Sequence, residues 1–431
     1  MRLHRNLVLA LIESLSQIFN QKKQADKVVA ITLKQDKRWG ARDRSFVAET
    51  IYEIVRWKRL YAKLAGLENE YKNDSYSDKN LFQLFSIWAI LKEIELPTWE
   101  EFEGINQEKI NEIKQNFNQL SEIRKYKESI PDWLDNLGEA ELGNDIWTKE
   151  IAALNNQAPV ILRVNTLKIS IDKLQKQLSE QNIETKKITQ NNTTYPDALE
   201  LLERKNILTN ALYKDGFFEI QDASSQLIAY FLDLKNEERN NTKKGLQIID
   251  TCAGAGGKSL HIASLLQNKG QITAMDIYEN KLIELRKRAN RADVHNIKTH
   301  TIKRENRNGK IDYSQFKPFH NSADRVLIDA PCSGLGVLSR NPDAKWKLSL
   351  EFLAEIKQTQ QNLLQEYSKM TKKGGKLVYA TCSILPSENQ KQVETFLNSE
   401  NGKDFKFIED KKIFSHQTGF DGFYMALLEK V

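Results

Sequence analysis

Apolar residues recur at three- and four-residue intervals through the first 150 residues of the chain. One such stripe consists of Leu7, Leu11, Leu15 and Ile18. A later stripe consists of Leu81, Leu84, Phe85, Trp88 and Leu91. This spacing places the apolar side chains on one face of a helix. Because no convincing strand pattern occurs before residue 155, we predict an all-α helical bundle over residues 1–150.

Between residues 151 and 240, short strand-like runs are mixed with helical patterns. Residues 160–164 and 216–220 are short runs rich in apolar side chains, as strands are. Residues 171–178 have a helical pattern, and the polar run 235–244 has the composition of a linker. We therefore predict a small α+β linking subdomain over residues 151–240.

Residues 241–431 alternate short apolar runs with helical patterns. The runs cover residues 246–249, 271–275, 326–328 and 377–379, and each leads into a turn and usually a helix. Such alternation is typical of a mostly parallel sheet with helices on both faces. We predict a Rossmann-like α/β domain over residues 241–431, so the fold class is multidomain, with all-α, α+β and α/β parts in that order.

The composition is that of a folded protein with more than one core. Of the 431 residues, 40% are hydrophobic and 28% are charged, and no apolar run approaches the roughly 20 residues that cross a bilayer. We therefore expect no membrane association. The three cysteines are an odd and sparse set, which argues against disulfides and for a cytoplasmic protein. They form no C-x-x-C pair, so we expect no metal.

The net charge of +6 is unevenly distributed along the chain. Residues 1–60 hold 13 Lys and Arg against 6 Asp and Glu, and residues 281–310 hold 10 against 3. Residues 61–150, by contrast, hold 10 against 19. Two basic segments that flank an acidic one are compatible with a polyanionic partner, and equally with solvated helix faces.

A glycine-rich loop at residues 250–259 follows the first predicted strand of the α/β domain and opens a helix. Such a loop lets backbone N–H groups approach a ligand closely. It is no P-loop, because Cys252 stands where that motif needs glycine, and no dinucleotide fingerprint, because Ser259 replaces the third glycine. Asp276 ends the next predicted strand, where a carboxylate accepts hydrogen bonds from ribose hydroxyls. Loop and acid together fit the adenosine part of S-adenosylmethionine, and the alternative is a simple turn between strand and helix.

Two cysteines stand in turns after neighbouring predicted strands. Cys332 comes three residues after Asp329, and Cys382 follows the next strand. In a doubly wound sheet these strand ends line the ligand crevice. One cysteine alone would be better explained as a small buried side chain, but two in such turns beside an acid favour the crevice. The set suits methylation of a pyrimidine at C5, in which a thiolate adds at C6, C5 takes the methyl group and an acid stabilises charge at N3. The spacing does not say which thiol attacks.

Over essentially its whole length the sequence resembles the RsmB/NOP/Sun family of RNA cytosine C5-methyltransferases, most closely the bacterial RsmB branch. The resemblance is carried by Asp-Ala-Pro-Cys-Ser at 329–333 and Ala-Thr-Cys-Ser at 380–383. Further matching motifs are Leu-Arg-Val-Asn-Thr at 162–166, Phe-Glu-Ile-Gln-Asp-Ala-Ser-Ser at 218–225, Arg-Asn-Pro-Asp-Ala-Lys-Trp at 340–346 and Asp-Gly-Phe-Tyr at 421–424. One departure is Ala255, where the family usually has proline.

The resemblance implies a role for each residue of the crevice. Cys382 is the nucleophile, Cys332 assists product release, and Asp329 contacts the cytosine. S-adenosylmethionine is the implied cofactor, with Asp276 at its ribose and either Glu305 or Asn306 at its adenine. The remaining implied cofactor contacts are Cys252, Ala253, Gly254, Ala255, Gly256, Gly257, Lys258 and, again, Asp329.

The helical part resembles the RNA-binding domain of the antitermination factor NusB, particularly over residues 43–56. This likeness implies that RNA is the binding partner, and it points to small-subunit (16S) ribosomal RNA. We expect the protein to be monomeric. The residues expected to contact RNA are Arg42, Arg44, Arg56, Lys58, Arg59, Arg163, Asn165 and Arg340. Phosphate contacts of this kind position RNA without reading its sequence.

The leading hypothesis is thus an S-adenosylmethionine-dependent methyltransferase that makes 5-methylcytosine in small-subunit ribosomal RNA. An enzymatic alternative keeps the chemistry and takes tRNA or another RNA as substrate. An alternative from another class is a non-catalytic RNA-binding assembly factor that retains the cofactor fold. The intact cysteine motifs argue against the last of these.

Overall fold

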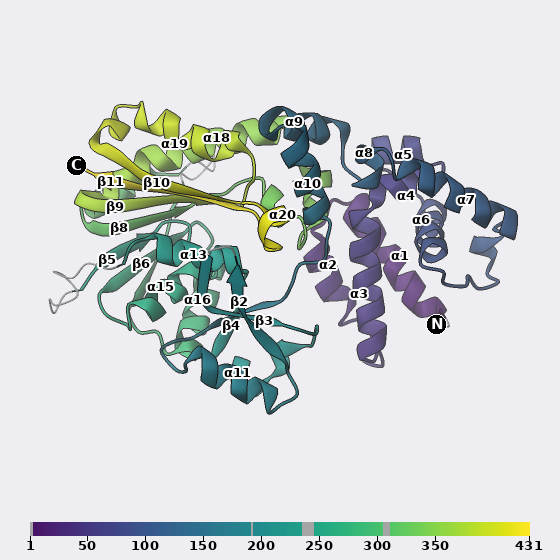
Figure 1. Ribbon diagram of the computed structural model, residues 1–431, viewed down its shortest axis with the longest axis horizontal. Coiled ribbons are helices and arrows are strands. Elements are labelled where there is room, and N and C mark those ends of the chain that lie inside the picture. The colour runs from purple at the N-terminus through teal and green to yellow at the C-terminus, as the bar shows by residue number, and fades with distance from the viewer. Residues whose placement is uncertain (1–2, 191–192, 235–244, 305–310) are drawn as a thin grey trace. The chain divides into compact units, whose positions relative to one another are not determined.

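The computed structural model describes residues 3–190, 193–234, 245–304 and 311–431 (Figure 1). These residues form two compact units. The first comprises Met1–Asn156 together with Leu338–Leu348, and the second comprises Gln157–Val337 together with Ser349–Val431. The expected linking subdomain therefore belongs to the same unit as the α/β sheet. Among the described helices, none combines the length and the apolar character that crossing a membrane requires.

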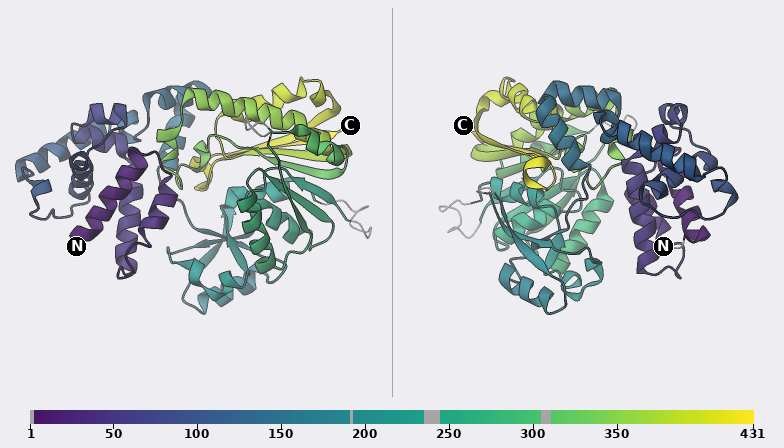
Figure 2. Two further views of the ribbon diagram at one scale, coloured as in Figure 1. Left: turned by 180° about the vertical axis from the view of Figure 1, so that it is seen from behind. Right: turned by 45° about the vertical axis from the view of Figure 1, so that its right-hand side comes forward.

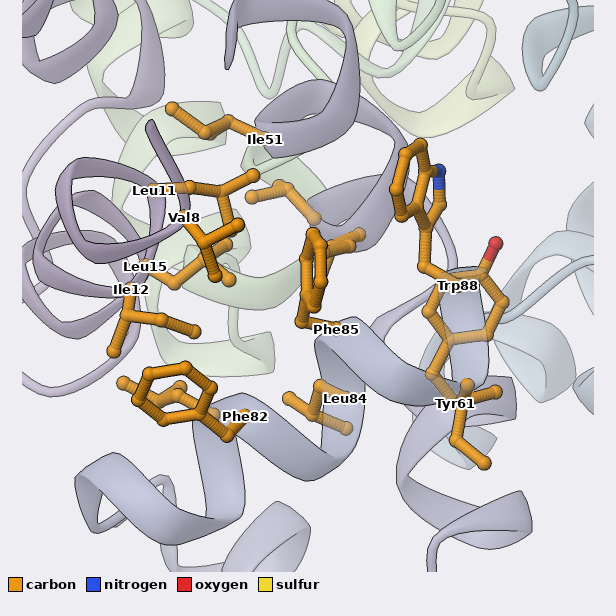
Figure 3. Packing of buried hydrophobic residues seen from close by; sticks show 14 of the residues in the cluster. Val8, Leu11, Ile12, Leu15, Ile51, Tyr61, Phe82, Leu84, Phe85 and Trp88 are labelled. Carbon is orange, nitrogen blue, oxygen red and sulfur yellow. The ribbon is translucent and has the colours of Figure 1, made fainter. Parts of the chain in front are cut away.

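The first unit is all-helical, as its apolar stripes predict. Its helices are α1 (Arg5–Phe19), α2 (Ala25–Thr32), α3 (Ala41–Arg56), α4 (Lys58–Leu64), α5 (Glu68–Asn73), α6 (Asp78–Leu91), α7 (Gln107–Leu120), α8 (Arg124–Lys127), α9 (Asp132–Leu142), α10 (Asn144–Leu154) and α17 (Ala344–Lys347). Leu11 and Leu15 of α1, Ile51 of α3 and Phe85 of α6 are fully buried and belong to one core (Figure 3). The unit is thus held together by the apolar faces that the three- and four-residue spacing creates.

Segment 338–348 belongs to this helical unit although it lies almost 200 residues further along the chain. The Arg56 guanidinium donates to the carbonyl of Ser339 at 2.9 Å, and the Trp346 indole donates to the carbonyl of Val55 at 2.6 Å. Lys345 is 1% exposed and donates to the Asn155 side chain at 3.2 Å. The segment is therefore part of the helical core, which no local sequence pattern indicates.

The second unit begins with a four-stranded antiparallel sheet of order β2-β3-β1-β4. Its strands are β1 (Ile161–Val164), β2 (Thr185–Gln190), β3 (Thr193–Leu201) and β4 (Phe218–Ile220). Its helices are α11 (Ile171–Ser179), α12 (Ala211–Lys214) and α13 (Ala223–Phe231). The α+β prediction is confirmed, and the β2–β3 hairpin is an addition that the sequence patterns do not reveal.

A seven-stranded sheet of order β10-β11-β9-β8-β5-β6-β7 forms the rest of this unit. Its strands are β5 (Gln247–Asp250), β6 (Gln271–Asp276), β7 (Ile297–Thr301), β8 (Ala323–Asp329), β9 (Thr371–Thr381), β10 (Phe405–Ile413) and β11 (Phe423–Lys430). β5 to β9 pair in parallel, whereas β10 and β11 pair antiparallel at one side. The mostly parallel sheet is therefore confirmed.

Helices cover both faces of this sheet (Figures 1 and 2). They are α15 (Gly257–Leu265) and α16 (Glu279–Ala292), which pack with α13 on one face, and α18 (Leu350–Tyr367) and α19 (Gln390–Leu397) on the other. The short α20 (Ser415–Thr418) lies between β10 and β11 in the chain. Ile248 packs in the core that includes α13, α15 and α16, and its neighbour Ile249 packs in the core that includes α18 and α19. Neighbouring residues of a strand point to opposite faces, so continuous apolar runs bury both sides. Short 3-10 helices lie at Glu100–Phe102, Ile207–Thr209, Tyr313–Phe319, Leu335–Val337, Ser368–Met370, Pro386–Glu388 and Asn401–Asp404.

Gly138 of α9 offers a test of packing in the helical unit. A Cβ added there would lie 2.3 Å from the ring of Trp147, which is fully buried. Alanine favours a helix over glycine by about 1 kcal/mol, but overpacking of this kind costs about 1–3 kcal/mol. We expect Gly138→Ala to lower the melting temperature measured by circular dichroism, whereas the exposed Asn136→Ala on the same helix leaves it nearly unchanged. A raised melting temperature for Gly138→Ala would contradict this prediction, because it would show that α9 and α10 can move apart at no cost in free energy.

Candidate active site

The carboxyl ends of β5, β6, β8 and β9 open into a cavity of about 1000 Å³. Ligands of open α/β sheets bind at this edge. The cavity is lined by eight of the residues expected there: Cys252, Ala253, Gly254, Lys258, Asp276, Asp329, Cys332 and Cys382. The structure thus brings together the glycine loop, both acids and all three cysteines. Glu305 and Asn306, the alternatives for an adenine contact, lie outside the described residues.

The glycine loop and Asp276 are tied to each other. One carboxylate oxygen of Asp276 accepts from the Gly254 N–H at 2.8 Å, and the other accepts from the Tyr278 N–H at 2.8 Å. Gly254 and Gly256 have φ values of +55° and +85°, a region that favours glycine. A Cβ at Gly256 would also lie 2.5 Å from Leu285 of α16. The loop can therefore take this path only with glycine at these positions.

Two arginines hold carbonyl groups of the same loop. Arg288 of α16 donates to the Ala255 carbonyl at 2.8 Å, so the loop is fixed there without the usual proline. Arg163 of β1 donates to the Gly257 carbonyl and to the side chain of Gln221. Sequence reasoning missed Arg288 entirely. An arginine on the helix that follows the second strand is the only signal that the sequence offers for it.

The expected RNA contacts at Arg163 and Asn165 are corrected by this arrangement. Their exposed fractions are only 4% and 6%. The Asn165 amide donates to the carbonyls of Gly216 and Ala292 at 2.9 and 2.8 Å. Both side chains therefore support the interior of the second unit and are not available to phosphates.

Most of the basic residues expected to contact RNA on the helical unit are also engaged internally. Arg56 is 9% exposed and bonds to backbone carbonyls, and Arg44 donates to the Trp39 carbonyl at 3.0 Å. Lys58 is 2% exposed beside Asp74, and Arg59 is 7% exposed with its guanidinium on the Ile130 carbonyl. Arg56, Lys58 and Arg59 are buried, so the expectation that they contact RNA phosphates is corrected. Arg42 is exposed and Arg340 half-buried, and their contact with RNA stays a prediction.

The two thiols of the paired motifs touch. Cys332 Sγ lies 3.2 Å from Cys382 Sγ, and both are free cysteines. The hydrogen bond with Cys382, burial and the nearby negative charges raise the pKa of Cys332 well above its usual range. Cys332 is therefore a protonated thiol at neutral pH, able to donate its S–H to Cys382 Sγ.

Lys258 and Asp329 form an ion pair in the cavity, with Nζ and Oδ2 2.5 Å apart. Burial lowers the pKa of Lys258, but the negative charges of Asp329 and Cys382 outweigh burial and raise it. Lys258 therefore stays protonated. Its ammonium group therefore places a positive charge beside Asp329 in the cavity.

Cys252 differs from the other two thiols. Burial and the charge of Asp250 raise its pKa, so it remains a neutral thiol. Burial also raises the pKa of Asp250 to about 7. Within the described part of the chain, no group of three or more His, Cys, Asp or Glu side chains is arranged to hold a metal ion.

A buried polar cluster anchors α15, the helix that begins in the glycine loop. His261 Nε2 lies 3.0 Å from an oxygen of Asp197, which also accepts from the Tyr230 hydroxyl at 2.5 Å. Burial lowers the pKa of His261 to about 4 despite the neighbouring carboxylate. The imidazole is therefore neutral in the folded protein at neutral pH.

This buried histidine predicts a pH dependence of stability. Below its ordinary pKa of about 6.5 His261 takes up a proton only when the protein unfolds, so stability is complete above pH 6.5 and is lost as the pH falls toward 4. The loss amounts to about 3 kcal/mol at most. We expect the melting temperature of His261→Gln to fall less steeply over this pH range than that of the wild type, and that of the exposed His295→Gln to follow the wild type. Parallel profiles for His261→Gln and wild type would contradict this origin.

Comparison with known proteins identifies similar methyltransferases. The family described as 16S rRNA methyltransferase RsmB/F matches residues 229–429, and the ferredoxin-like domain of RsmF/B-like methyltransferases matches residues 130–208. A probable ribosomal RNA small subunit methyltransferase B from Synechocystis is 33% identical over 70% of this chain and 67% of its own length. Its counterpart from Bacillus subtilis is 32% identical over 62% of this chain and 59% of its own length. The matches thus span about three fifths to two thirds of these relatives.

Solved structures share the fold. The crystal structure of PH0851 matches all of this chain and all of its own with a TM-score of 0.78 at 22% identity. The crystal structure of NSun6 from Pyrococcus horikoshii with SFG covers 71% of this chain and 100% of its own, with a TM-score of 0.60 at 21% identity. At this level of identity the likeness speaks for the fold alone.

Proposed function

The chain belongs to the RsmB/F family of 16S rRNA methyltransferases, and from this membership we propose that it makes 5-methylcytosine in small-subunit ribosomal RNA through a covalent adduct with Cys382. The observation that carries the proposal is the contact between two thiols, 3.2 Å apart, in the cavity that also holds Asp329 and Lys258. C5 of cytosine is a poor nucleophile until a thiolate adds at C6. The cavity contains the groups that this addition requires.

The state of Cys332 supports a division of roles between the two thiols. The hydrogen bond with Cys382 and burial raise the pKa of Cys332, which makes Cys332 the poorer nucleophile, and we assign the attack to Cys382. The Cys382 thiolate bonds to C6, and C5 takes the methyl group, whose sulfonium donor is left as a neutral thioether. The C5 proton then passes to water, its C–H electron pair restores the C5–C6 double bond, and the C6–S bond breaks to return Cys382 as a thiolate. Cys332 assists the release, and Asp329 contacts the cytosine edge near N3, where negative charge develops.

S-adenosylmethionine is the proposed methyl donor, and it supplies an electrophilic methyl group on a sulfonium. The residues of the cavity fit it. Each carboxylate oxygen of Asp276 gives one lone pair to a backbone N–H and keeps another for a ribose hydroxyl. Gly254 has open space around the position of a Cβ, so its backbone is accessible to a ligand. The chain's own residues contribute by holding the cofactor and by excluding other orientations of it in the cavity.

The proposed roles predict opposite results for the two cysteines. Cys382→Ala is expected to abolish both methylation and the covalent RNA adduct, because no thiol then attacks C6. Cys332→Ala is expected to form the adduct and accumulate it, because release is slowed. Denaturing gels with labelled RNA measure both, and the double variant should behave as Cys382→Ala does. An adduct with Cys382→Ala and none with Cys332→Ala would reverse the roles.

Bisulfite sequencing of RNA from a strain that lacks the gene tests the substrate. We expect one or more cytosines of small-subunit ribosomal RNA to lose their protection, and the gene with intact cysteines to restore it. Loss of protection in tRNA instead would transfer the activity to that substrate. Unchanged ribosomal and transfer RNA would overturn the enzymatic proposal and favour an assembly factor.

A further inference from the structure

Glu388 is a buried carboxylate that the proposed chemistry does not use. It ends the short 3-10 helix Pro386–Glu388, which follows β9, and it is 0% exposed. One carboxylate oxygen accepts from the hydroxyls of Ser333 and Ser383, each at 2.5 Å. The other accepts from the Ser333 N–H at 2.8 Å and from the Gln360 amide at 3.1 Å. Four donors therefore converge on this one side chain.

The two serines directly follow the two cysteines. Ser333 comes after Cys332, and Ser383 comes after Cys382. Their hydroxyls also lie 3.2 Å from each other. Glu388 thus joins two loops that are separated by 50 residues in the chain and that carry the two thiols of the cavity.

We propose that Glu388 is a positioning residue that fixes the loops of Cys332 and Cys382 relative to each other and so sets the contact between their thiols. The inference rests on the proposed function only for its consequence in catalysis. Its structural content rests on the hydrogen bonds of the buried carboxylate.

The chemistry of the side chain supports this role. An ionised carboxylate offers four lone pairs and no donor, which matches the four donors that surround it. Hydrogen bonds to a charged acceptor are roughly twice as strong as neutral ones. All four partners are donors, so an apolar side chain at this position would leave buried donors without an acceptor. A merely packed position would not need a carboxylate.

Glu388 is itself held by hydrogen bonds at the C-terminal end of its short segment. Its backbone carbonyl accepts from the Tyr379 hydroxyl at 2.7 Å. The next residue, Asn389, donates to the Ser383 carbonyl at 2.9 Å and accepts from the Thr381 hydroxyl at 2.5 Å. The carboxylate is therefore anchored to β9 and to the loop of Cys382, and it reaches from there to the loop of Cys332.

A second link joins the same loops through the backbone. The Gly336 N–H donates to the Cys382 carbonyl at 2.9 Å, and the Gly422 N–H donates to the Gly336 carbonyl at 2.7 Å. A Cβ at Gly336 would lie 2.1 Å from the Gly422 carbonyl oxygen, so only glycine fits. This link stays when Glu388 is changed, so loss of the carboxylate loosens the loops without separating them.

Two thiols that act in turn on one ring must keep their spacing, because a misplacement of about 1 Å can cost on the order of 100-fold in rate.

The test compares Glu388→Gln with the wild-type full chain and with Glu394→Gln, which changes an exposed glutamate nearby on α19. The amide that replaces the carboxylate in Glu388→Gln would turn its NH2 toward donors that need an acceptor. We expect kcat for RNA methylation to fall about 10- to 100-fold. The dissociation constant for S-adenosylmethionine should change less than about twofold, since the glycine loop and Asp276 do not contact Glu388.

A second readout does not depend on methylation. Diamide oxidises two touching thiols to a disulfide, and it takes up the two electrons and two protons that they lose. Intact-mass and peptide analysis gives the rate at which Cys332 and Cys382 become linked. We expect Glu388→Gln to slow this reaction at least fivefold and Glu394→Gln to leave it unchanged.

Each outcome decides the inference. Wild-type kcat together with wild-type linking in Glu388→Gln would overturn it. Slow linking in the variant, with no methylation even by the wild type, would keep the positioning role and remove the proposed function. If Glu388→Gln fails to fold, Ser333→Ala and Ser383→Ala each delete one arm of the bridge, and wild-type linking rates in both would overturn the inference.

Discussion

Parallel pairing of β5 with β6 and β8, and of β8 with β9, brings four strand ends to one edge of the sheet. Each of these strands ends at a group that can bind a ligand or react. The glycine loop follows β5, Asp276 ends β6, and a loop that carries a cysteine follows each of β8 and β9. The parallel ladder fixes the spacing of these ends, and apolar side chains on both faces fix the ladder. Without this register the thiols, 50 residues apart in the chain, would not meet.

Several acidic side chains lie close together in the site, and each has a different kind of partner or environment. Asp276 satisfies both oxygens with backbone N–H groups, Asp329 pairs with Lys258, and Glu388 accepts from four neutral donors. Asp250 takes another route, since burial raises its pKa to about 7. These arrangements leave one protonated lysine and one protonated thiol beside Cys382.

The basic residues of the helical unit show how little charge alone says about binding. Arg56 and Lys345 are buried, and they donate hydrogen bonds to backbone carbonyls and to the Asn155 side chain. Their partners come partly from segment 338–348, which follows the loop of Cys332 in the chain. A basic segment in a sequence can therefore serve internal hydrogen bonding, and the count of charges that remain for an external partner is smaller than the sequence indicates.

The sequence by itself determined the helical character of the first 150 residues, the α+β subdomain without its β2–β3 hairpin, the mostly parallel sheet and eight of the residues that line the cavity. It could do so because apolar periodicity and glycine- or proline-marked turns are local properties. Only the tertiary structure decided which charged groups face inward. The sequence predicts that Arg163 contacts RNA, whereas in the structure Arg163 donates to the Gly257 carbonyl. No sequence pattern indicates a role for Glu388, whose hydroxyl partners are brought to it only by the fold. The reason is physical: a side chain's partners depend on burial and on contacts between distant segments, which spacing along the chain does not encode.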